Sequence, residues 1–129
     1  MPTYSNTTPP YALFPGDVGY SFGSAAGGEA MPADGTAGSQ LAVPQPAGFP
    51  KQGHDVRWQT LFTGSPTAVN FVLQAALNDV DAEYGTIDTS TVISGEARTV
   101  VDVAARFLRI KKVSSTGGTS PTVVAKLIV

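Results

Sequence analysis

The chain has 129 residues, a formal net charge of −2 and no cysteine. This charge gives no strong field toward nucleic acid or an anionic membrane, and the lack of cysteine excludes disulfides, thiolate nucleophiles and cysteine zinc sites. A single histidine, His54, is too few for a multi-histidine metal site, and no apolar run predicts a membrane-spanning helix. The first residues lack the basic and apolar parts of a secretory signal, so we expect the chain to be made in a cytoplasm.

Residues 1–55 are predicted to form a long extended arm rich in proline and glycine. They hold nine of the 14 glycines and eight of the 10 prolines, a density typical of low-complexity segments. Disordered tails are poor in aromatic residues, whereas this segment is not. We expect it to lay aromatic side chains into pockets, chiefly on neighbouring subunits, through five anchors: Tyr4, Tyr11, Phe14, Tyr20 and Phe22.

Residues 56–129 are predicted to form the folded body. The clearest pattern lies at 67–77, where Val69, Phe71 and Leu73 recur on one face with the period of two that is typical of a strand. Helix formers at 74–77 make a helix the alternative there. Six strands are expected in all, at 56–62, 67–77, 83–88, 99–103, 105–113 and 122–129. This spacing, without a βαβ rhythm, predicts an all-β fold: an antiparallel β-sandwich or jelly-roll body behind the arm.

The last two strands flank a Ser-, Thr-, Gly- and Pro-rich segment at 114–121, which predicts a β-hairpin with a long loop. The final strand is apolar on both faces. Val124 and Ile128 alternate with Val123 and Leu127, so one face is expected to meet the domain core. The other face then needs cover, and we predict that Val124 and Ile128 contact a neighbouring subunit or the arm.

Possible catalytic and metal sites are few. His54 and Asp55 are the only pair that resembles part of a catalytic triad, but adjacent residues rarely orient one another, and a solvated linker pair is the preferred interpretation. Residues 78–83 offer several oxygen ligands, so calcium is conceivable at Asp79 and Asp81, although the spacing is not that of an EF-hand loop. A polar turn is the preferred interpretation. We expect no enzyme activity, no cofactor and no bound metal.

Two further patterns concern binding. Arg106, Arg109, Lys111 and Lys112 form a basic run, but on a strand Arg109 and Lys111 face one side while Arg106 and Lys112 face the other. The run therefore predicts no single patch for nucleic acid. Trp58 and Tyr84 are candidates for a sugar-stacking platform, with core packing as the preferred place for Trp58.

The body resembles a module that is frequent in structural proteins of tailed bacteriophages. The resemblance is carried by residues 58–61, 63–69, 71–79, 105–110 and 117–123, which together span about 70 positions. It also looks like a pared-down discoidin-type sandwich, in which an aromatic strand of this kind lies in the core. The strand around Glu83 and Tyr84 departs from the usual pattern.

The resemblance implies a small virion protein on a phage capsid surface, assembled in the host cytoplasm. A chain of this size with an aromatic arm is similar to capsid decoration, or cement, proteins, which bind the major capsid protein and often form homotrimers. The expected function is thus to decorate and stabilise a capsid by binding across its subunits. A carbohydrate-binding module, or a head–tail or tail component, is the alternative. No nucleic-acid or membrane partner is expected.

Overall fold

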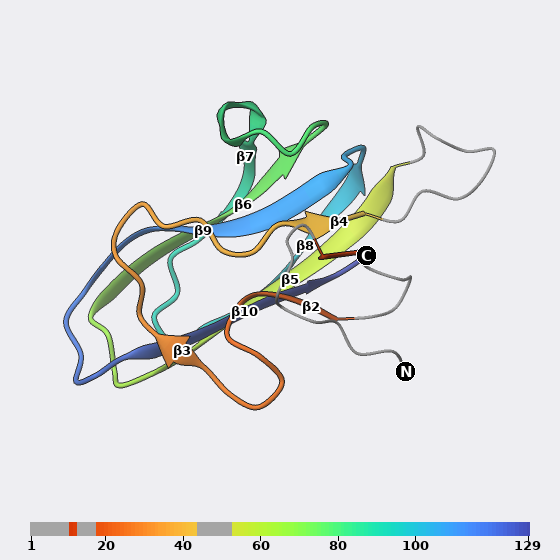
Figure 1. Ribbon diagram of the computed structural model, residues 1–129. Helices are drawn as coiled ribbons and strands as arrows, with labels where there is room; N and C mark the ends of the chain where they lie inside the picture. Colours follow the sequence, from red (N-terminus) through yellow and green to blue (C-terminus); the bar gives the residue numbers. More distant parts are fainter. Residues whose placement is uncertain (1–10, 13–17, 44–52) are drawn as a thin grey trace.

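The computed structural model describes residues 11–12, 18–43 and 53–129, and these form a β-sandwich of two sheets (Figure 1). Sheet A has the order β1 (Tyr11–Ala12), β4 (Leu41–Ala42), β9 (Phe107–Thr116), β6 (Ala68–Ala76) and β7 (Gly85–Ser90). Sheet B has the order β2 (Gly19–Phe22), β10 (Thr122–Ile128), β5 (His54–Thr63) and β8 (Ala97–Val103), and β3 (Glu29–Ala30) also pairs with β10. One short 3₁₀ turn, η1 (Asp81–Glu83), interrupts the connection from β6 to β7.

The predicted all-β sandwich is confirmed. Alternating burial along β10, where every second residue from Val123 to Leu127 is buried, is the pattern that the sequence predicts for a strand with one face on a core. The helix alternative at 74–77 is wrong, because Gln74, Ala75 and Ala76 continue the antiparallel ladder between β6 and β9. Among the described strand pairs, β1 with β4 is the parallel exception. No helix in these described ranges is long and apolar enough to cross a membrane.

The predicted hairpin at the end of the chain is wrong. β9 pairs with β6 and β4 in sheet A, whereas β10 lies in the middle of sheet B between β2 and β5. The connection at 117–121 therefore crosses from one sheet to the other, and so does the connection from β5 to β6. Turn-forming residues signal a reversal of the chain, which a sheet crossing needs as much as a hairpin does.

The two crossings lie against each other at one end of the sandwich. The backbone N–H of Thr119 donates to the carbonyl oxygen of Gly64 over 2.8 Å. Gly64 has a φ of +81°, and a Cβ there would lie 2.6 Å from the Cα of Pro121. Glycine is required at this point, both for the left-handed backbone and for the close approach.

The described part of the predicted arm is built into the sandwich. β2 extends sheet B beside β10, and β4 extends sheet A beside β9. Phe22 is 3% exposed and packs edge-on against Phe71, with ring centroids 5.9 Å apart. The expectation that Phe22 contacts a neighbouring subunit is therefore corrected, because its ring fills the core of its own chain.

The core lies between the two sheets and draws on both parts of the chain. Its buried apolar residues are Phe22, Leu41, Val43, Val56, Trp58, Val69, Phe71, Leu73, Ala105, Leu108, Ile110, Val123, Ala125 and Leu127. A hydroxyl also ties the arm across the layers. Ser21 on β2 accepts the backbone N–H of Ile110 on β9 over 2.9 Å. The segment 18–43 thus contributes both apolar burial and inter-sheet hydrogen bonds to the domain.

Candidate interaction surface

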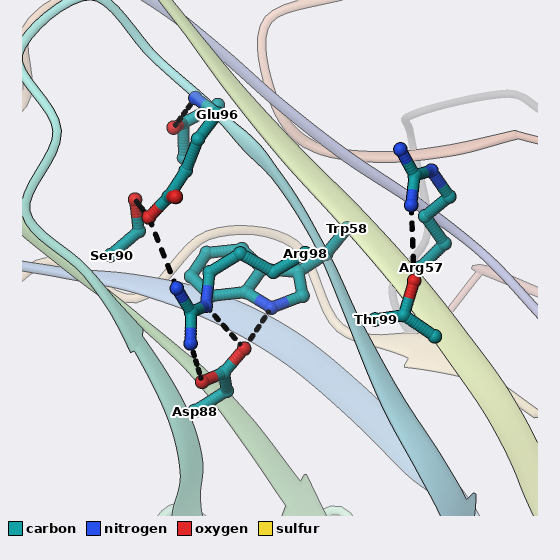
Figure 2. Close-up of polar contacts among 8 residues, drawn as sticks. Arg57, Trp58, Asp88, Ser90, Glu96, Arg98 and Thr99 are labelled. Carbon is teal, nitrogen blue, oxygen red and sulfur yellow. Dashed lines mark hydrogen bonds and ion pairs between the residues drawn. The ribbon is translucent and has the colours of Figure 1, made fainter.

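A cluster of five side chains joins the two sheets on the side where β7 and β8 form the sheet edges (Figure 2). We call it the inter-sheet cluster; its members are Trp58, Asp88, Ser90, Glu96 and Arg98. Arg98 on β8 donates from Nε and Nη2 to the two carboxylate oxygens of Asp88 on β7, over 2.8 and 3.0 Å. The indole Nε1 of Trp58 on β5 donates to Asp88 Oδ2 over 2.9 Å.

Glu96 extends the cluster toward the turn between the sheets. Its carboxylate accepts a hydrogen bond from Ser90 Oγ over 2.8 Å and an ion pair from Arg98 over 3.4 Å. Burial alone would raise the pKa of Asp88, but the hydrogen bonds from Arg98 and Trp58 outweigh it and hold that pKa below its ordinary value. Each charged member of the cluster is bonded to another member, which makes the cluster a structural clasp between the sheets.

A second cluster covers the outer face of sheet A. Arg109 is 3% exposed, donates to Gln74 Oε1 and to Asp81 Oδ1 over 2.8 Å each, and lies 4.0 Å from the ring centre of Tyr84. Burial and a hydrogen bond to Asp79 raise the pKa of Tyr84. The hydrogen bond from Arg109 lowers the pKa of Asp81. A guanidinium held between a carboxylate and an aromatic ring is stable. The charge of Arg109 is already paired within the chain, so it is not offered to a substrate.

The third charged contact binds the arm to sheet A. Lys112 on β9 is buried, and its Nζ donates to the carbonyl oxygen of Pro32 over 2.6 Å and to Asp34 Oδ1 over 2.7 Å. The hydrogen bond from Lys112 lowers the pKa of Asp34. The basic run is thus divided between the two faces of β9 as predicted, with Arg109 and Lys112 each held by its own acidic partner.

The predicted sugar platform is wrong. Trp58 is 1% exposed in the core, and Tyr84 is buried over Arg109 on the outer face of sheet A. The two rings do not share a surface, and neither presents a face to solvent. The preferred interpretation of Trp58 as a core residue is confirmed.

The other candidate sites are also accounted for by local contacts. Asp79 accepts the hydroxyl of Tyr84 over 2.8 Å, and Asp81 accepts Arg109, so both carboxylates of the conceivable calcium loop are engaged. Within the described ranges, no three His, Asp or Glu side chains are grouped to hold a metal ion. Asp55 accepts the backbone N–H of Asp102, while His54 Nε2 is buried without a hydrogen-bond partner among the described residues.

The outer face of sheet B is the surface on which the sequence predicts contacts with a neighbouring subunit or the arm, at Val124 and Ile128. Both residues lie on this face and are half-buried, opposite Leu61 and Arg57 of β5. Tyr20 stands opposite Lys126 on the same face. Of the predicted arm anchors, Tyr4 and Phe14 lie outside the described residues, as does the side chain of Tyr11, which enters β1 by its backbone.

A hollow of about 180 Å³ marks this outer face. The side chains that line it from the outer face are Val18, Arg57, Gln59, Ala97, Lys126 and Ile128. Val18 is 43% exposed at its rim, and Leu61 and Val101 are exposed elsewhere on the sheet. Figure 2 shows Arg57 with Thr99, away from the inter-sheet cluster; its Nη1 donates to the hydroxyl of Thr99 over 3.0 Å.

The connection between β6 and β7 is a second exposed region, which the sequence signals only as a turn. Every residue from Leu77 to Glu83 is exposed, with Leu77 at 63% and Val80 at 50%. Three carboxylates, Asp79, Asp81 and Glu83, stand among these apolar side chains. Figure 1 shows the connection at the top, projecting from the end of sheet A.

These residues define an all-β sandwich protein whose described charged clusters are bonded within the chain, one of them between the two sheets. No protein-family model matches the sequence, and comparison with curated proteins finds no relative.

Proposed function

We propose that the chain is a structural virion protein that decorates a phage capsid and stabilises it by binding across capsid subunits. The observation that carries the proposal is that the buried and clustered charged side chains form ion pairs within the chain. Arg98, Arg109 and Lys112 each bind a carboxylate of the same chain. Catalytic sites instead hold titratable groups poised for a substrate. A scaffold of this kind offers surfaces for contact, which is what a stabilising protein needs.

The capsid contact is assigned to the start of the chain. Strand β1 pairs with β4, and β4 with β9, so the strand that follows residues 1–10 in the sequence lies at the edge of sheet A. Their sequence offers Tyr4 among prolines, the composition of a segment that binds in an extended form at low entropic cost. With Phe22 committed to the core and Tyr20 on the outer face of sheet B, the anchors proposed for the capsid at the start of the chain are Tyr4, Tyr11 and Phe14.

The test uses capsids assembled without this protein and a pelleting assay. Full-length chain should sediment with the capsids, and a variant lacking residues 1–10 should be retained at least about tenfold less, because it loses Tyr4, one of the three proposed aromatic anchors. A larger deletion of residues 1–50 is unsuitable, since it also removes β2 and β4 with Phe22 and Leu41.

The fluorescence of Trp58, the only tryptophan, provides the folding control. The variant lacking residues 1–10 should unfold at the same denaturant concentration as the full-length chain. Full-length protein that stays in the supernatant at every capsid concentration would refute the proposal.

A further inference from the structure

We propose that copies of this chain bind one another head to tail, with the β6–β7 connection of one copy lying in the hollow on the outer face of sheet B of the next. The proposal is independent of the capsid, because it requires only copies of this chain. It rests on two surfaces whose charge and apolar character are complementary.

The hollow is cationic and apolar. Lys126 makes no ion pair with any described residue, and Arg57 is bound only to the neutral hydroxyl of Thr99. Asp34, Asp88 and Glu96 are held by Lys112 and Arg98, and Asp55, two residues before Arg57, accepts the backbone N–H of Asp102. Val18 and Ile128 supply the apolar wall. An occupant with carboxylates beside apolar side chains would satisfy both features.

The β6–β7 connection has this composition. Leu77 and Val80 are exposed large apolar residues, and Asp79, Asp81 and Glu83 stand between and beside them. The shape of the connection is held in advance. Asp79 accepts Tyr84, Asp81 accepts Arg109, and Glu83 accepts the side-chain amide of Asn78 over 3.1 Å. A preorganised segment loses less conformational entropy when it binds.

The β6–β7 connection can reach the hollow only from another copy. Within one chain the connection belongs to sheet A, and the hollow lies on the far side of sheet B, with the core between them. Pairing two sheet B faces would instead bring the cations of one copy toward the same cations of its partner, which is unfavourable. The contact is therefore between unlike surfaces, and such contacts close into rings or extend as filaments.

The experiment is sedimentation velocity of the full chain over a range of protein concentrations, in low and high salt. Wild-type protein should associate with rising concentration, and about 0.5 M salt should weaken the association because it screens the charges. Lys126→Glu and Glu83→Lys should each weaken association by about tenfold or more. Glu29→Lys, a change of equal size on an exposed residue outside both surfaces, should associate as wild type does.

Mixing the two reversed variants gives the decisive result. Each variant alone places like charges at positions 83 and 126, whereas in the mixture an acidic residue at one of these positions can again face a basic residue at the other. The mixture should recover association, with unfolding followed by Trp58 fluorescence to show that both variants are folded. Wild-type protein that stays monomeric at all concentrations, or reversed variants that associate like wild type, would overturn the proposal.

Discussion

Arg98 and Asp88 form a two-pronged ion pair across the gap between the sheets, with Nε and Nη2 of the arginine 2.8 and 3.0 Å from the carboxylate oxygens. The pair connects β8 in sheet B to β7 in sheet A, which share no backbone ladder. The same carboxylate also receives the indole of Trp58. Three segments that are distant in the sequence are thus fixed by one acidic side chain.

Asp88→Asn should destabilise the fold by about 1–2 kcal/mol, because the charge that pairs with Arg98 is lost while an acceptor for Trp58 remains. Urea unfolding followed by Trp58 fluorescence measures the effect. Asp55→Asn is the matched control, since that exposed carboxylate accepts a backbone N–H of Asp102, and it should cost less than about 0.5 kcal/mol. Equal losses in the two variants would show that the clasp adds nothing to stability.

The contribution of Asp88 should also depend on pH. Its pKa in the fold lies below the ordinary 3.8, so the unfolded state binds the proton more readily. The stabilisation is therefore fully present above about pH 5 and is lost as pH falls through the lowered pKa. The difference in unfolding free energy between wild type and Asp88→Asn should be constant from pH 7 to pH 5 and should shrink toward pH 3. A difference that grows on acidification would contradict the geometry.

Phe22→Ala should cost about 3–4 kcal/mol, because it empties a core position packed against Phe71. Tyr20→Ala, two residues earlier on the outer face of the same strand, should cost less than about 1 kcal/mol. Denaturant midpoints of the two variants provide the measurement. The contrast distinguishes an arm built into its own domain from an arm that merely lies on it, for which the two losses would be similar and small.

Two glycines with nearly the same backbone test the contact between the sheet crossings. Gly64 and Gly35 have φ of +81° and +84°, but a Cβ at Gly35 meets no atom within 4 Å. Alanine at Gly35 should therefore cost only the backbone strain of about 1 kcal/mol. Alanine at Gly64 should cost at least about 2 kcal/mol more, because Pro121 and Thr119 must move. Thermal melts of both variants report the difference.

Much of the fold could be predicted from residue patterns, and the errors have physical reasons. Alternation located β5 and β10 because each has one buried face, and it located β6 by its core residues although Val72 and Gln74 on the other face are buried as well. It could not show that β9 and β10 lie in different sheets, because a turn signal is local and sheet membership depends on distant partners. The density of glycine and proline concealed β2 and β4, which are only four and two residues long.

Only part of the outer face of sheet B could be predicted as a contact surface from the sequence. Val124 and Ile128 stood out because the final strand is apolar on both faces. The partners that complete the hollow, Arg57 and Ala97, are brought to it by the β10–β5–β8 pairing, which no local pattern encodes. The role of Asp88 was also missed, since Trp58 and Arg98 reach it from strands that are 30 and 10 positions away.

The position of β10 has a consequence for how the chain reaches this structure. Strand β2 can pair in sheet B only with a strand about a hundred positions further along the chain, since Tyr20 pairs with Lys126. β5 needs the same late strand over seven consecutive residue pairs. Chains dominated by such distant pairings fold slowly, because loop closure must precede any gain from contact. Sheet B therefore has no centre during synthesis until residues 122–128 emerge, and the earlier strands expose their apolar faces in the meantime.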